Sequence, residues 1–284
     1  MWGSSKLVMN CSDLVEIDLS NATEFTDSGA AAIAKAKNLE RLWLVRCKLV
    51  SDIGIGCIAV GCRKLRLINL KWCLRVGDLG VGLNRYEVQG DPLFGSLLLN
   101  RQEISLLKLL AAFDAITSVD LPYGCFHIDL DGLTNLKQGC KSLEVLNMSN
   151  CPCISQYGLS FITNGAECLR QFNISYGPPV TLDLAKCLQY FSNLQSIRLD
   201  GCIVTCSGMK AIGNWCASLK ELSLSKCSGV TDEGLSLIVQ GHQELRKLDI
   251  TCCRKITQAS INSITNSCTC LTSLRMESCS PGSE

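Results

Sequence analysis

A pattern of leucines recurs along this chain with a period of 25 to 27 residues and constrains its fold more than any other feature. Each occurrence has the form LxxLxL, and in most units a cysteine follows eight residues after the first leucine, as Cys47 follows Leu39. A variant of Val-Thr-Asp-x-Gly-Leu comes next, as in residues 230–235. The hexads begin at Leu14, Leu39, Leu65, Ile116, Leu143, Leu169, Leu194, Leu219, Leu245 and Leu271. A fixed period of this length is typical of stacked structural repeats.

Each repeat combines the signals of one strand and one helix. The hexad alternates apolar with variable residues, which indicates a short strand. The Gly-Leu-x-x-Ile run, as in Gly234 to Ile238, has helical spacing, and Thr231 or Ser155 just before such a run is a candidate helix N-cap. One strand and one helix per repeat predict an α/β fold, a leucine-rich-repeat solenoid. We expect a right-handed horseshoe with parallel strands on the concave face and helices on the convex face.

The repeats also predict how the chain is organised. Residues 1–13 are expected to be the tail of a preceding repeat, and residues 14–284 to form a solenoid of about eleven units. The step of 51 residues from Leu65 to Ile116 corresponds to two repeats, with an irregular insertion near 84–93 and a degenerate repeat near 94–115. Because the chain lacks polar caps at both ends of the array, we expect it to be a piece of a longer array or a truncated gene product.

Composition excludes several classes of protein. A net charge of +1 argues against a general nucleic-acid binder or a polybasic membrane binder. No signal-peptide stretch or membrane-spanning apolar run occurs, so we expect a cytoplasmic or nuclear location. Most of the 20 cysteines occupy two repeat positions, eight after the first hexad residue or three before the next hexad. We therefore expect them to be free, buried thiols.

The search for catalytic, metal or cofactor sites yields none. His127 and His242 lie in different repeats without a Cys or Ser partner at fixed spacing, and we expect both to be exposed polar residues. Three pairs of cysteines lie close together in the sequence: Cys151 with Cys153, Cys252 with Cys253, and Cys268 with Cys270. Each pair contains a cysteine that already fills a repeat position, which favours a structural role in the repeat over zinc binding. No phosphate-binding glycine loop is present. The sequence predicts no enzyme and no cofactor.

Candidate binding residues lie at the variable positions of the strands, which are expected to face the concave surface. A first cluster combines tryptophan with cations on adjacent strands, a composition enriched in binding hot spots: Arg41, Trp43, Asn69 and Lys71. The alternative is that Trp43 only covers aliphatic surface. A second set alternates in sign, which favours a solvated, self-neutralising face: Arg198, Asp200, Lys247, Asp249 and Arg275.

The pattern LxxLxLxxCxx(I/V)TDxGLxxIxxxCxx resembles the cysteine-containing leucine-rich repeats of F-box proteins. Residues 15–73 and 194–238 are similar to the plant F-box/LRR-repeat protein three type. The resemblance covers essentially the whole chain and is weakest from Leu83 to about Asp129. It implies a substrate receptor of a cullin-RING ubiquitin ligase, in which an N-terminal F-box docks on a Skp-type adaptor and the repeats hold the protein substrate. We expect the F-box to be absent from this chain.

Two other functions remain open at this stage. A small molecule or inositol phosphate could fill the concave face. Such a site would need several cations close together, and Arg41 with Lys71 supplies only two. The chain could also be a truncated product without function, since the repeat is disrupted between Leu83 and Asp129. The ubiquitin-ligase hypothesis rests on the family resemblance, because fold alone does not imply function.

Overall fold

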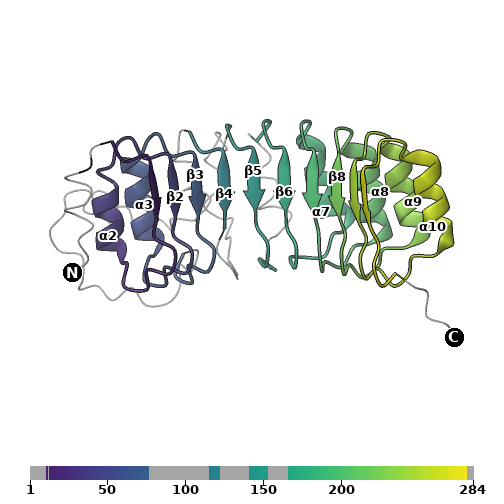
Figure 1. The fold of residues 1–284 in the computed structure, drawn as a ribbon, viewed down its shortest axis with the longest axis horizontal. Coiled ribbons are helices and arrows are strands. Elements are labelled where there is room, and N and C mark those ends of the chain that lie inside the picture. Colours follow the sequence, from purple (N-terminus) through teal and green to yellow (C-terminus); the bar gives the residue numbers. More distant parts are fainter. Residues whose placement is uncertain (1–10, 12, 77–114, 122–140, 153–165, 280–284) are drawn as a thin grey trace. The chain divides into compact units, whose positions relative to one another are not determined.

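The computed structural model describes residues 11, 13–76, 115–121, 141–152 and 166–279. The chain divides into two compact units, Met1–Leu143 (unit 1) and Glu144–Glu284 (unit 2). Figure 1 shows that, in both units, the strands run side by side and the helices pack on one side of them. The helices of the described residues are ten residues long or shorter, and none is long and apolar enough to cross a membrane.

The described residues of unit 1 form four parallel strands whose hydrogen-bonded order follows the chain. Its described elements are β1 (Glu16–Asp18), α2 (Asp27–Ile33), β2 (Arg41–Trp43), α3 (Asp52–Gly61), β3 (Leu67–Asn69) and β4 (Ser118–Asp120).

In unit 2, the part that the structure describes contains six parallel strands, again in chain order. Its described elements are β5 (Val145–Asn147), β6 (Gln171–Asn173), α7 (Leu182–Lys186), a 3-10 helix η1 (Cys187–Tyr190), β7 (Ser196–Arg198), α8 (Cys206–Trp215), β8 (Glu221–Ser223), α9 (Asp232–Gly241), β9 (Lys247–Asp249), α10 (Gln258–Ser267) and β10 (Ser273–Arg275).

The register of the strands confirms the repeat and the alternation read from the hexads. Equivalent hexad positions face each other, as Ile17 faces Leu42 and Leu42 faces Ile68. These three side chains are buried between sheet and helices, while the residues on either side of them point outward. We call the outward side of the sheet in each unit its strand face. The α/β leucine-rich-repeat fold predicted from the sequence is confirmed.

The connection from β3 to β4 departs from the regular period. Leu67 pairs directly with Ser118, and Leu70 N donates a hydrogen bond to Asp120 O, although 51 residues separate Leu67 from Ser118. β3 and β4 are therefore neighbours in the sheet. The degenerate repeat expected near 94–115 and the insertion expected near 84–93 lie almost wholly outside the described residues.

The recurrent cysteine after each strand links its repeat to the preceding one. In six repeats its buried thiol donates a hydrogen bond of 2.9 to 3.2 Å to a backbone carbonyl near the end of the preceding strand. The pairs are Cys47 with Leu19, Cys73 with Leu44, Cys202 with Ile174, Cys227 with Leu199, Cys253 with Leu224, and Cys279 with Ile250. Every cysteine that the structure describes is free, as expected.

The Thr-Asp step after the cysteine links its repeat to the following one. Thr231 caps its own helix by accepting a hydrogen bond from Gly234 N, which confirms that predicted N-cap, whereas Ser155 lies outside the described residues. The carboxylate of Asp232 accepts hydrogen bonds from Thr257 N and from the hydroxyls of Thr257 and Ser260, at the start of the next helix. Asp27 receives equivalent bonds from Ser51 and Gly54.

A left-handed residue follows each of nine described strands, seven residues after the first hexad residue, and sequence analysis missed it. Its φ is between 55° and 66° at Asn21, Arg46, Trp72, Asn150, Tyr176, Lys226, Cys252 and Ser278, and 70° at Gly201. Residue type gave little signal, because Asn or Gly, which tolerate positive φ, occupies only Asn21, Asn150 and Gly201 among these nine positions. At each of these positions the conformation turns the chain out of the strand and into the loop that follows.

Candidate protein-binding surface

The strand face of unit 1 brings together two groups of polar side chains. Arg41 on β2 pairs with Glu16 on β1, with Nη2 and Nε lying 2.6 and 2.8 Å from Oε2. On the neighbouring strands, Asn69 Nδ2 donates to Asp120 Oδ2 at 2.9 Å, and Lys71 Nζ lies 3.4 Å from Asp120 Oδ1. The predicted cations Arg41 and Lys71 thus each lie beside a carboxylate.

Trp43 lies in the row between these groups. The register places it between Asp18 on β1 and Asn69 on β3, and its side chain is half-buried. The hydroxyl and the backbone N–H of Ser20 hold the pKa of Asp18 below its usual value by hydrogen bonding to the carboxylate. The strand face of unit 1 therefore presents the Trp43 side chain flanked by polar groups with fixed partners, a composition that suits a protein interface.

The strand face of unit 2 is a shallow depression of about 280 Å3 over β7 to β10. Four predicted residues line it, namely Arg198, Lys247, Asp249 and Arg275, together with Glu221 and Ser223. Lys247 Nζ lies 2.6 Å from Glu221 Oε1, and Arg275 Nη1 lies 4.0 Å from Asp249 Oδ2. Asp200 instead accepts hydrogen bonds from the Ser223 hydroxyl and from Ser225 N.

These ion pairs agree with the alternating signs in the sequence. Both side chains of the Lys247 and Glu221 pair are substantially exposed, at 60% and 43%. Such pairs contribute at most about 1 kcal/mol, so a partner's charges can replace them at little cost. In the described residues Arg198 has no side-chain hydrogen bond or ion pair. Whether either strand face binds a partner stays a prediction.

Sequence analysis left three carboxylates out of the candidate residues. Glu16, Asp120 and Glu221 each pair with a predicted cation on the neighbouring strand. All three occupy outward hexad positions, which was the available signal. Their pairing could not be predicted, since it depends on the register between repeats and, for Asp120, on the direct contact of β3 with β4.

The expectation that His242 is exposed was wrong. Its side chain is buried, with Nδ1 2.7 Å from Ile238 O and Nε2 2.7 Å from Cys216 O. It lies three residues before Leu245, at the repeat position that Cys62, Cys216 and Cys268 fill elsewhere. His127 lies outside the described residues, in which no group of three or more His, Cys, Asp or Glu is placed to hold a metal.

Comparison with known sequences finds leucine-rich repeats in two of the segments where the sequence predicts them. A leucine-rich-repeat family model matches residues 10–34 and 216–239. The chain is 25% identical over 227 residues to F-box/LRR-repeat protein 4 from Bos taurus. That match covers 76% of this chain and 31% of the bovine protein, so the chain spans about a third of the length of this relative.

Comparison with solved structures finds other leucine-rich-repeat chains, of which the Rad7 match supports the fold. A structure of the Rad7 and Elc1 complex in yeast matches 96% of this chain and 71% of that chain, with a TM-score of 0.53 and 16% sequence identity. An internalin from Listeria monocytogenes matches 88% of this chain and 73% of that chain, with a TM-score of 0.46 and 13% identity. At this level of identity the Rad7 match shows the leucine-rich-repeat fold and nothing further.

Proposed function

We propose that this chain is a protein-binding leucine-rich-repeat module that recognises the substrate of an F-box ubiquitin ligase. One structural observation carries the binding part: the interior, the cysteines and the Thr-Asp steps are occupied by packing between repeats, whereas the strand faces carry outward side chains. On unit 1 these include Trp43 between polar groups. Side chains of this kind favour recognition of a protein surface over chemistry.

The ubiquitin part of the proposal rests on resemblance. The repeat pattern is similar to that of F-box proteins, and the relative from Bos taurus is named an F-box/LRR-repeat protein. Docking on a Skp-type adaptor and a cullin would require an F-box, supplied from outside the repeats described here. The cytoplasm or the nucleus is the location that this function requires.

The alternative of a small-anion receptor on the strand face gains no support. It depended on Arg41 and Lys71 acting together on one anion. In the structure Arg41 lies against Glu16 and Lys71 lies near Asp120, so carboxylates already balance both charges. We therefore prefer a protein partner.

Affinity capture from plant extract tests the binding part. The double variant Trp43→Ala, Lys71→Gln removes the aromatic ring and one cation from the unit 1 strand face. A matched control, Lys35→Gln with Val60→Ala, changes exposed residues on the helix side of the same unit. We expect the wild type and the control to recover the same partner, and the strand-face variant to bind the purified partner about tenfold more weakly or worse.

Equal affinity of all three proteins for that partner would contradict the strand-face assignment. The ubiquitin part is tested separately by joining an F-box to the chain and adding Skp-type adaptor, cullin and RING subunit. The captured partner should then acquire ubiquitin. A partner that binds but stays unmodified would leave a binding module without the proposed ligase role.

A further inference from the structure

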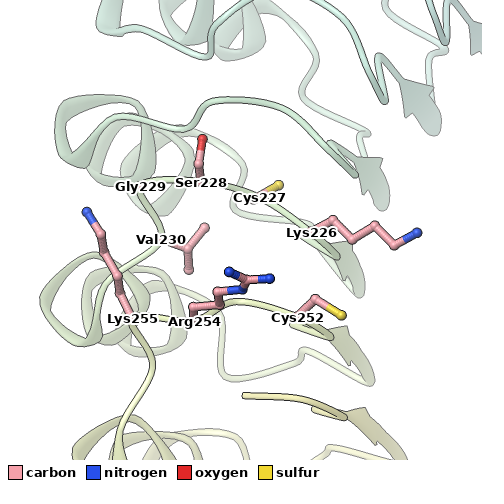
Figure 2. A pocket seen from close by; sticks show the side chains of 8 residues that line it. All are labelled: Lys226, Cys227, Ser228, Gly229, Val230, Cys252, Arg254 and Lys255. Carbon is pink, nitrogen blue, oxygen red and sulfur yellow. The ribbon is translucent and has the colours of Figure 1, made fainter. Parts of the chain in front are cut away.

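A depression lies away from the strand face, between two consecutive loops of unit 2. It has a volume of about 540 Å3 and is lined by residues 226–230, which follow β8, and by Cys252, Arg254 and Lys255, which follow β9 (Figure 2). Both loops leave the carboxyl ends of parallel strands, so the depression lies where the strands end and not beside an outermost strand. We call this row of strand ends the carboxyl edge of the sheet, or simply the edge. This volume is in the usual range for ligand-binding depressions.

The floor of the depression is apolar. Cys227 and Val230 are buried beneath it, and the Cys227 thiol is already bonded to Leu199 O. Gly229 adopts a φ of +91°, and a Cβ there would collide with Val204 O, so the loop can follow this path only with glycine. The floor is thus held in place by the repeat packing and offers an apolar surface to a ligand.

The rim of the depression is basic. Lys226, Arg254 and Lys255 are exposed, and in the described residues none of these side chains has a hydrogen bond or an ion pair. The two loops contain no acidic residue, and the nearby Asp232 carboxylate is occupied by Thr257 and Ser260. These three cations without ion pairs contrast with Lys247 and Arg275 on the strand face, which lie beside carboxylates, and with a chain of net charge +1.

The cations form a row instead of converging. Figure 2 shows the Lys226 side chain directed toward the strands, the Lys255 side chain directed away from them, and the Arg254 guanidinium between the two. A single compact anion such as phosphate would be bound by cations gathered on one point. A row of cations beside an apolar floor fits several carboxylates spaced along an extended ligand.

We propose that this edge of unit 2 binds an acidic segment of a partner protein, with one apolar side chain of the segment in the depression and flanking Asp or Glu residues against Lys226, Arg254 and Lys255. The inference rests on the proposed function only in taking the ligand to be part of a protein. It uses no residue of either strand face.

Fluorescence anisotropy of a labelled peptide tests this proposal. The probe is a fluorescein-labelled segment of Asp and Glu residues around one central Leu, and a second probe replaces that Leu with Ser. The edge variant is Lys226→Gln, Arg254→Gln, Lys255→Gln. A control variant removes the same number of charges from the opposite edge and from a helix, at Lys220, Arg246 and Lys210.

We expect the wild type and the control variant to bind the Leu probe with similar affinity, and the edge variant to bind it about tenfold more weakly or worse. Affinity should fall as salt is raised, because exposed charges are screened. The Ser probe should bind more weakly than the Leu probe. Equal binding by the edge variant and the wild type would overturn the proposal, as would equal losses in the edge and control variants.

Two competing ligands are separate arms of the same experiment. Displacement of the probe by inorganic phosphate at ionic strengths where sodium chloride has no effect would identify a compact-anion site and overturn the acidic-segment proposal. Tighter binding of a labelled single-stranded oligonucleotide than of the Leu probe would also overturn it. Because the edge variant leaves Trp43 and Lys71 intact, this test and the strand-face test can fail independently.

Discussion

His242 shows how one repeat position accepts a different residue when the backbone around it offers suitable partners. Cys62 at this position donates its thiol to Ile33 O in the preceding repeat. His242 contacts Ile238 O in α9 and Cys216 O at the end of α8, each at 2.7 Å. A larger side chain with two polar atoms thus spans carbonyl groups at the ends of two adjacent helices.

Substitution of His242 tests this role. His242→Ala should lower the free energy of unfolding by about 2 to 4 kcal/mol, because it leaves a cavity and removes both contacts to buried carbonyls. His242→Cys should lose less, since cysteine fills the same position in neighbouring repeats. Urea denaturation measures both variants. A His242→Ala protein as stable as the wild type would contradict the structural role.

At the scale of the element, the starts of α3 and α10 depend on the Thr-Asp step of the preceding repeat. Burial favours a higher pKa for Asp232, but the hydrogen bonds from Ser260 and Thr257 outweigh it and hold that pKa below its usual value. The carboxylate lies on α9 and its donors lie at the start of α10. A lowered pKa means that this contribution is lost as pH falls toward the pKa of Asp232.

Asp232→Asn should destabilise α10 more than α9. The substitution removes the charge from three hydrogen bonds, and we expect a loss of about 1 to 3 kcal/mol in the free energy of unfolding. Hydrogen exchange should accelerate first at amides of α10. Glu233→Gln, one residue along on an exposed side chain, is the matched control and should leave exchange in α10 unchanged. Equal effects of the two substitutions would refute the link between repeats.

At the scale of the whole molecule, the buried thiols make stability depend on alkaline pH. Burial raises the pKa of Cys47 to about 11, and to about 12 for Cys62, Cys73, Cys216 and Cys253. In an unfolded chain a thiol has a pKa of about 8.5. Between these values the unfolded chain binds fewer protons than the folded one, so the free energy of unfolding falls as pH rises.

Each buried thiol should lower the free energy of unfolding by up to about 1.4 kcal/mol for each pH unit in this alkaline range. Urea denaturation under reducing conditions, from neutral pH to pH about 10, measures the slope. Cys216→Ala should give a shallower slope than the wild type, whereas Cys270→Ala, which removes an exposed cysteine, should give the same slope. A Cys216→Ala slope equal to that of the wild type would contradict the prediction.

The strand positions, the buried hexad leucines and the buried repeat cysteines could be predicted from the sequence. All of them follow from a local period: alternate residues of a strand point to opposite sides, and the period recurs every 25 to 27 residues. The same reasoning placed Trp43 and Lys247 on the outward side of their strands. It could not place His242, because its burial depends on carbonyls at Ile238 and Cys216.

The sequence by itself determined the repeat, the fold class and the side of each strand on which a residue lies. Only the tertiary structure decided which groups meet. The Cys227 thiol bonds to Leu199 O, Asp232 binds Thr257, and Lys71 approaches Asp120, across 28, 25 and 49 residues of sequence. These contacts form between stacked repeats, so they depend on register and on the pairing of β3 with β4, which no local pattern encodes.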